Sequence, residues 1–195
     1  PLTQLVRLMV GREVTELYPT RTARMGPTVL QASGLHAGRR LTRASFTLAQ
    51  GEILGIAGLI GAGRTELVRA VFGLEESTGG VVTLEGRTFA TRGPRASWRA
   101  GLGFLSENRK EEGLMQSLSV AENTVLPKLA GLARCGWLRR GGVDAAGAAW
   151  IDRLGIRASG PRQPVGTLSG GNQQKVALAR LLEYPARMGL LEQEN

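Results

Sequence analysis

A glycine-rich stretch near residue 60 has the residue types and spacing that bind phosphate. It reads Gly58-Leu59-Ile60-Gly61-Ala62-Gly63-Arg64-Thr65-Glu66 and lies between an apolar run and a helical pattern. Such a turn exposes successive backbone N–H groups beside the positive end of a helix, which together attract an anion. The usual motif adds a lysine and a Ser/Thr, and here Arg64 supplies the charge and Thr65 a hydroxyl for Mg²⁺. We predict phosphate binding by Gly58, Gly61, Ala62, Gly63, Arg64, Thr65 and Glu66, with a purely structural glycine turn as the alternative.

A second stretch with the same kind of chemistry lies near the C-terminal end of the sequence. It reads Leu168, Ser169, Gly170, Gly171, Asn172, Gln173 and opens a helical pattern. A hydroxyl, backbone N–H groups and the helix dipole would there face a terminal phosphate. The alternative is an ordinary serine N-cap followed by a Gly-Gly turn, which is common in proteins.

The elements that must position these two stretches follow from the spacing of apolar residues. The spacing predicts a buried strand over 53–57 leading into the glycine-rich stretch, and helices over 64–72 and 169–182 after the two stretches. Other strands are expected at 28–31, 45–48, 81–84 and 102–105, and a short helix at 94–100. Between them, helices are expected at 119–131 and 144–154, separated by Gly141-Gly142, and a further short helix near 5–10.

Composition excludes several classes of protein. A length of 195 residues with 42% hydrophobic residues fits one soluble domain with a sizeable core. The net charge of +9 is spread along the chain, and aromatic residues that stack on bases make up only 5%, so we expect no nucleic-acid partner. The single Cys135 excludes an internal disulfide and fits a reducing compartment. No signal peptide or membrane-spanning run is expected, and the missing initiator Met suggests a cut N-terminus.

The order and the residues of the two motifs resemble those of the ATP-binding-cassette ATPases. The resemblance narrows to the second cassette of the tandem ATPase subunit in ribose-, galactose- and xylose-type ABC importers. It is carried by residues 58–67, 106–114 and 172–175, and by residues 9–13 and 17–19, which resemble the connector between two cassettes. The resemblance implies an α/β P-loop NTPase cassette with an antiparallel β edge and a helical subdomain. The implied divisions are a connector at 1–27, the P-loop core at 28–110, the helical subdomain at 111–165, and the signature helix with the start of the return to the core at 166–195.

The resemblance also implies a role for each stretch. The glycine-rich loop would hold the triphosphate of ATP, with Thr65 on Mg²⁺. Glu107 stands where most cassettes have the Q-loop glutamine, and residues 108–127 would contact the permease. Ser169 and the glycines after it would face the nucleotide held by the first cassette. No aromatic ring precedes the loop for adenine, and we interpret the nearest ring, His36, as incidental.

Parts of the catalytic machinery of the family have no counterpart at the expected positions. The two aspartates, Asp144 and Asp152, both precede the signature and follow no apolar strand. The family places Asp-Glu about where Glu192 and Gln193 stand, and its switch histidine lies later still. We therefore expect a chain that is incomplete before its Walker B motif and shows no turnover alone. A cut, a frameshift and a decayed gene remain open explanations.

The resulting hypothesis is an ATP-binding subunit that couples ATP binding and hydrolysis to sugar uptake. The resemblance implies as partners the first cassette of the same protein, a permease dimer and, indirectly, a periplasmic sugar-binding protein. The implied location is the cytoplasmic face of the bacterial inner membrane. Two alternatives stay open: a truncated, non-hydrolysing nucleotide-binding remnant, and the cassette of a nucleoside or furanone-signal importer. A cassette of DNA repair or translation is disfavoured, because no coiled-coil or basic aromatic insertion is present.

Overall fold

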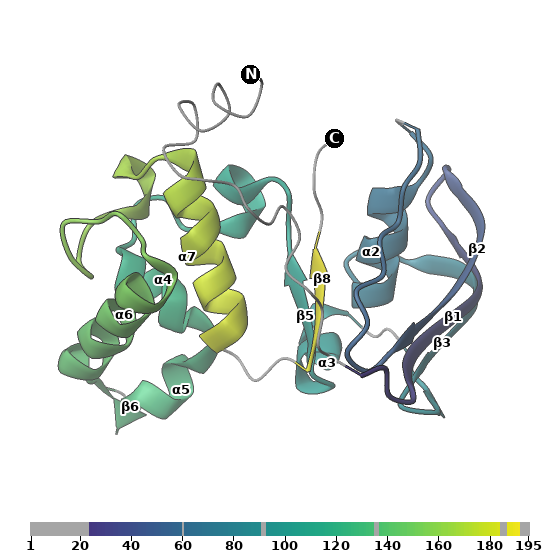
Figure 1. Ribbon diagram of the computed structural model, residues 1–195, viewed down its shortest axis with the longest axis horizontal. Helices are drawn as coiled ribbons and strands as arrows, with labels where there is room; N and C mark the ends of the chain where they lie inside the picture. Colours follow the sequence, from purple (N-terminus) through teal and green to yellow (C-terminus); the bar gives the residue numbers. More distant parts are fainter. Residues whose placement is uncertain (1–23, 60, 91–92, 135–136, 184–186, 192–195) are drawn as a thin grey trace, which may run out of the picture.

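The computed structural model describes residues 24–59, 61–90, 93–134, 137–183 and 187–191. Figure 1 shows a sheet lobe with helix α2, a helical lobe built on α4, α6 and α7, and a narrow parallel strand pair between them. The expected helix near residues 5–10, and most of the expected connector, lie outside the described residues. No helix in these ranges is long and apolar enough to cross a membrane.

The sheet lobe is an antiparallel sheet with the strand order β2-β1-β3-β4. Its strands are β1 (Thr28–Ala37), β2 (Leu41–Ala49), β3 (Ser77–Leu84) and β4 (Arg87–Thr88). Strands β1 and β2 are longer than predicted, because each continues through residues that alternate between buried and exposed sides. The expectation of an antiparallel β edge is confirmed.

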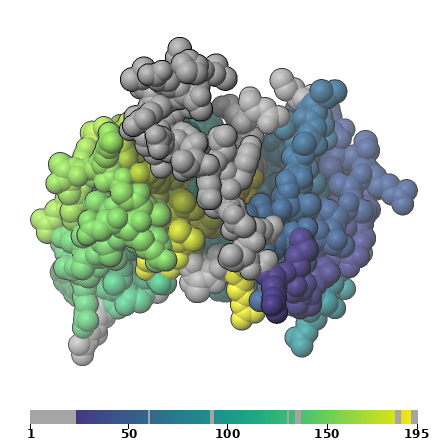
Figure 2. Space-filling view, in the orientation of Figure 1, coloured from purple at the N-terminus to yellow at the C-terminus, as the bar shows by residue number. Residues whose placement is uncertain are grey.

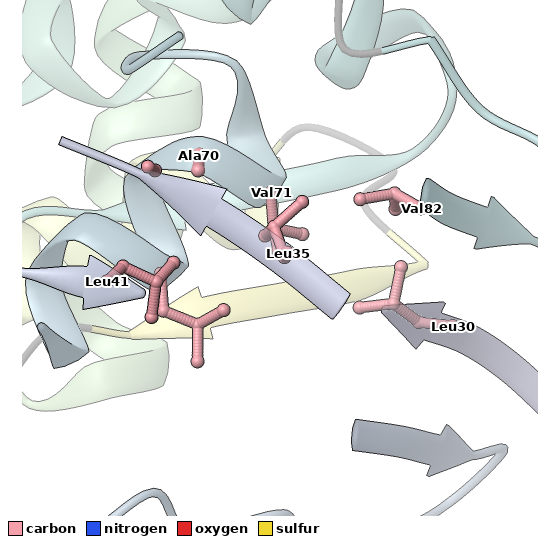
Figure 3. Packing of buried hydrophobic residues seen from close by; sticks show 8 residues of the cluster. Leu30, Leu35, Leu41, Ala70, Val71 and Val82 are labelled. Atoms are coloured by element: carbon pink, nitrogen blue, oxygen red, sulfur yellow. The ribbon is translucent and has the colours of Figure 1, made fainter. Parts of the chain in front are cut away.

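Helix α2 (Arg64–Phe72) covers one face of this sheet. Its apolar positions 67, 70 and 71 recur at helical spacing and turn toward the strands. Figure 3 shows Val71 beside Leu35, with Leu30 and Val82 from neighbouring strands close by. The buried cluster comprises Leu30, Leu35, Ala37, Leu41, Leu67, Ala70, Val71 and Val82. This core fixes where α2 begins relative to the sheet.

The predicted buried strand at 53–57 is wrong for this structure. Residues 52–59 form no helix or strand, and the side chain of Ile53 is 83% exposed. An extended apolar segment becomes a strand only where a neighbour accepts and donates its backbone hydrogen bonds. Among the described residues no strand pairs with this segment, so its apolar sequence alone does not make it a strand.

Two short parallel strands connect the lobes. Strand β5 (Leu102–Leu105) pairs in parallel with β8 (Met188–Leu191), in register from Leu102 with Met188 to Leu105 with Leu191. The short helix α3 (Pro94–Arg99) precedes β5, as predicted. Phe104 of β5 stacks on Phe72 at the end of α2, with ring centroids 5.1 Å apart. This aromatic contact therefore joins the β5–β8 strand pair to the sheet lobe.

The helical lobe contains α4 (Val120–Val125), α5 (Leu129–Leu132), α6 (Arg140–Leu154) and α7 (Gly170–Glu183). A 3₁₀ turn, η2 (Leu126–Lys128), joins α4 to α5, and Pro127 lies in it. The prediction that Gly141-Gly142 separates two helices is wrong, because both residues lie in the first turn of α6. Glycine costs a helix only about 1 kcal/mol relative to alanine, so a Gly-Gly pair does not by itself prevent a helix from beginning there. Helices α4 and α6 cross closely at Gly147, where a β-carbon would stand 2.5 Å from that of Ala121.

Candidate functional site

The glycine-rich loop is shaped by left-handed glycines directly before α2. Gly61 and Gly63 have φ angles of 83° and 85°, and the N–H of Ala62 donates to the carbonyl of Leu59 at 3.0 Å. These φ values favour glycine because it lacks a β-carbon. A β-carbon on Gly63 would also lie 3.2 Å from the backbone of Arg40, so the loop passes close to the turn between β1 and β2.

The start of α2 has free donors for an anion. Gly63 is the N-cap, and no side chain caps the first turn. The N–H groups of that turn, together with the helix dipole, are the features that bind phosphate in such loops. A β-carbon on Gly61 would meet no atom within 4 Å, so the space beside the loop is open. The loop geometry thus fits the predicted phosphate group.

Three side chains surround this helix start. Arg64 is half-buried, and its aliphatic stem lies 3.8 Å from the β-carbon position of Gly58. Thr65 is exposed, so its hydroxyl is accessible. The carboxylate of Glu66 lies 3.8 Å from the guanidinium of Arg40. The structure therefore groups a cation, a hydroxyl and a paired carboxylate around the loop, and phosphate binding by these residues stays a prediction.

The second predicted stretch lies at the start of α7. Leu168 is buried, whereas Ser169, Gly170 and Gly171 are exposed at the helix start. The Asn172 amide donates to the Ser169 hydroxyl oxygen at 2.9 Å. The backbone N–H groups of the two glycines therefore face solvent, beside a hydroxyl held by its neighbour.

Asn172 and Gln173 anchor this helix start to the helical lobe. The Asn172 side-chain oxygen accepts from the N–H of Arg157 at 2.9 Å. The buried Gln173 amide donates to the carbonyls of Val165 and Leu168 at 3.3 and 3.1 Å. Both residues were predicted as site residues, and the structure places them behind the helix start, where they hold the preceding loop.

A carboxylate missed by sequence reasoning links α2 to the segment after β5. Glu112 lies in a π-helical turn, η1 (Arg109–Gly113), and accepts from Ser106 at 2.8 Å and from Arg69 of α2 at 2.9 Å. The hydrogen bonds from Ser106 and then from Arg69 lower the pKa of Glu112. No sequence pattern joins residues 43 positions apart, so only the fold reveals this contact.

The same turn also contacts the start of α7. A β-carbon on Gly170 would stand 2.9 Å from the guanidinium of Arg109, so glycine leaves room for that side chain. Glu107, the predicted Q-loop position, lies just before the turn, and its carbonyl accepts from the N–H of Arg109 at 2.9 Å. The turn therefore lies between the last turn of α2, through Arg69, and the start of α7.

A groove of about 550 Å³ opens beside this turn. Its walls are aromatic and apolar with charged residues interspersed, and they include Phe72, Leu74, Trp98, Phe104, Glu112 and Arg180. Burial lowers the pKa of Arg180, which shows that its charge is poorly solvated. The groove combines an apolar surface with a cation that a carboxylate would stabilise.

A family model for ABC transporters matches residues 41–192. The chain belongs to the ABC transporter family. This cassette is 41% identical over 192 residues to the ribose import ATP-binding protein of Lacticaseibacillus paracasei, covering 98% of the chain and 38% of the relative. It is 47% identical over 185 residues to a ribose import ATP-binding protein of Rubrobacter xylanophilus, covering 95% of the chain and 37% of the relative. The chain thus spans less than two fifths of the length of these relatives.

Solved structures of the family share the fold of this cassette. A nucleotide-free ATP-binding cassette from an ABC transporter superposes with a TM-score of 0.69 at 18% identity, covering 84% of the chain and 68% of that structure. A bacterial Atm1-family ABC exporter with ATP bound gives a TM-score of 0.64 at 24% identity, covering 97% of the chain and 33% of that structure. The predicted cassette fold is therefore confirmed.

The two aspartates discussed from the sequence lie in the helical lobe, away from the phosphate loop of this ABC cassette. Asp144 and Asp152 are both on α6, and Asp144 pairs with Arg162 at 2.7 Å. The ring of His36 lies against Gly79, 3.4 Å from its β-carbon position. Glu192 and Gln193 lie outside the described residues. The described ranges contain no cluster of three His, Cys, Asp or Glu side chains that would hold a metal ion.

Proposed function

We propose that this chain is the ATP-binding part of a carbohydrate ABC importer. The observation that carries the proposal is the phosphate-type loop at α2, present in a chain whose relatives are named ribose import ATP-binding proteins. ATP, when bound with Mg²⁺, would supply the free energy for transport. The finer proposal is that the chain corresponds to the second cassette of a tandem protein.

The residues of this chain have distinct proposed roles in binding. The N–H groups of the first turn of α2 donate to phosphate oxygens, and Arg64 balances their charge. The Thr65 hydroxyl would ligate Mg²⁺. Ser169 and the N–H groups after it bind the terminal phosphate held by a facing cassette. This last role requires a second, facing cassette, and Ser169, Gly170 and Gly171 are exposed where it would bind.

The groove beside η1 is the proposed contact for a membrane permease. It lies within reach of the predicted contact segment 108–127, since Glu112 and Gly113 line it. Its aromatic walls favour an apolar helix, and the desolvated Arg180 favours an acidic residue on that helix. Cysteine crosslinking from Leu74→Cys in an assembled transporter checks this contact. Crosslinks to the permease are expected from position 74 and not from Arg43→Cys, on the exposed side of β2.

Nucleotide binding provides the direct test. Titration of a fluorescent ATP analogue into the chain should give saturable, Mg²⁺-dependent binding, which Arg64→Ala weakens at least tenfold. Arg43→Ala removes the same charge from an exposed position on β2 and should leave the affinity unchanged. Equal affinities for all three proteins would refute the role of Arg64.

The rate of phosphate release distinguishes a chain that only binds ATP from one that also hydrolyses it. We expect no Mg²⁺-dependent turnover from the chain alone, because both aspartates of the sequence lie on α6 and Glu66, just after the loop, is paired with Arg40. Turnover that disappears in Arg64→Ala would contradict this expectation and would favour a self-sufficient ATPase. A nucleoside or furanone-signal cargo is distinguished by transport assays of the assembled importer.

A further inference from the structure

An exposed indole projects from a short hairpin in the helical lobe. Strands β6 (Ala133–Arg134) and β7 (Trp137–Leu138) pair antiparallel just after α5. The side chain of Trp137 is 81% exposed and that of Leu138 is 41% exposed. Adjacent apolar residues with this exposure usually mark a contact surface in a soluble protein.

The chain around this hairpin is basic. Residues 126–143 include Lys128, Arg134, Arg139 and Arg140 and contain no Asp or Glu. Lys128 pairs with Glu183 at 3.1 Å, and Arg140 lies near the carboxylate of Asp144. Within the described part of the chain, the exposed Arg139 has no side-chain hydrogen bond or ion pair. Its charge is therefore available to an external anion.

Polar contacts tie α6 and the segment before the hairpin to α7. The indole N–H of Trp150 donates to Glu183 at 2.6 Å, and Lys128 pairs with the same carboxylate. The N–H of Arg139 donates to the carbonyl of Leu132 at 3.0 Å, which closes the hairpin. Figure 1 shows this end of the helical lobe far from the start of α7, where the signature residues lie.

We propose that residues 137–140 bind the headgroup region of an anionic lipid bilayer. Trp favours the membrane–water interface because its ring is apolar and its N–H is polar. Arginine beside it is attracted to anionic headgroups, at about 1 kcal/mol for each residue near the surface. Among possible partners, lipid fits best because the surface pairs an exposed indole with positive charge. The proposal does not depend on nucleotide binding or on the permease groove.

The test uses the whole chain with two kinds of vesicle. Cosedimentation is measured with phosphatidylcholine vesicles and with vesicles containing phosphatidylglycerol. Arg139→Gln should lower the partition into anionic vesicles by about fivefold. Arg43→Gln makes the same charge change on exposed β2 and should lower it less than about twofold. Equal effects of the two variants would overturn the proposal in favour of diffuse charge attraction.

The indole is tested in the same way. Trp137→Ser should lower the partition as strongly as Arg139→Gln does, whereas Leu59→Ser, at an 86% exposed position on the other lobe, should not. Brominated phosphatidylglycerol should quench part of the tryptophan fluorescence of the original chain, and this quenching should be absent from the Trp137→Ser variant. Unchanged quenching, or no binding to either vesicle, would overturn the proposal. Figure 2 shows the helical lobe and the sheet lobe on opposite sides of the molecule.

Discussion

Replacing Asn123 by alanine should destabilise the helical lobe more than any other polar substitution in α4. The Asn123 side chain is fully buried, and its oxygen accepts from the N–H of Met115 at 2.9 Å. Its amide donates to the carbonyls of Met115, Leu118 and Ser119 at 3.0, 3.2 and 3.0 Å. The Asn123 side chain therefore supplies, for the loop that follows η1, the backbone hydrogen bonds that a helix or strand would otherwise supply.

The expected magnitude follows from these bonds. The amide has two protons, so its three acceptors amount to two full hydrogen bonds and one shared bond. With the bond accepted from Met115, the variant loses about three net hydrogen bonds at about 1 kcal/mol each. Leaving a partly buried N–H without its acceptor adds about 1 kcal/mol. Asn123→Ala should therefore lower the free energy of unfolding by about 3–4 kcal/mol.

Urea unfolding followed by circular dichroism measures this loss, with Thr124→Val as the matched control. Thr124 is also fully buried, but its hydroxyl makes one hydrogen bond, to the carbonyl of Val120 at 2.8 Å within the same helix. That control should cost no more than about 1 kcal/mol. If Asn123→Ala costs no more than the control, the anchoring role of Asn123 is refuted.

Two further predictions concern helix packing and acid stability. Gly147→Ala should cost about 1–3 kcal/mol in urea unfolding, since its β-carbon would stand 2.5 Å from that of Ala121, whereas Gly141→Ala in the same helix meets nothing within 4 Å and should not destabilise. Hydrogen bonds from the Ser119 hydroxyl and N–H lower the pKa of Glu122, so its contribution to stability is full above the ordinary value of 4.5 and is lost as pH falls below it. The unfolding midpoint of Glu122→Gln should accordingly change less between pH 6 and pH 3 than that of the unaltered chain, and identical pH profiles would contradict the assignment.

The helices that follow the two glycine-rich stretches were predictable from the sequence. The helix over 64–72 and the helix beginning at Gly170 follow from apolar spacing and from glycines at their starts. These signals are local, because helical hydrogen bonds join residues four apart. Helix α3 was placed correctly for the same reason, whereas the short strand β5 was placed correctly because its apolar run also has a partner, β8.

The prediction failed where the outcome depended on distant neighbours. Residues 53–57 have a strand-like composition, but a strand also needs a partner, and none pairs with them among the described residues. Gly141-Gly142 have a breaker composition, yet they lie in the first turn of α6. Composition cannot report where in a helix a residue will lie, since the packing of α6 against α4 decides its start.

The sequence by itself determined the residue types at each phosphate-type helix start and the family to which they belong. Glycines, Arg64, Thr65 and Ser169 carry this information locally, through φ preference, charge and hydroxyl chemistry. Only the tertiary structure decided that Glu112 joins Ser106 to Arg69 and that the Arg109 side chain fills the space over Gly170. These contacts join segments far apart in the chain, and their existence depends on how the two lobes pack around β5 and β8.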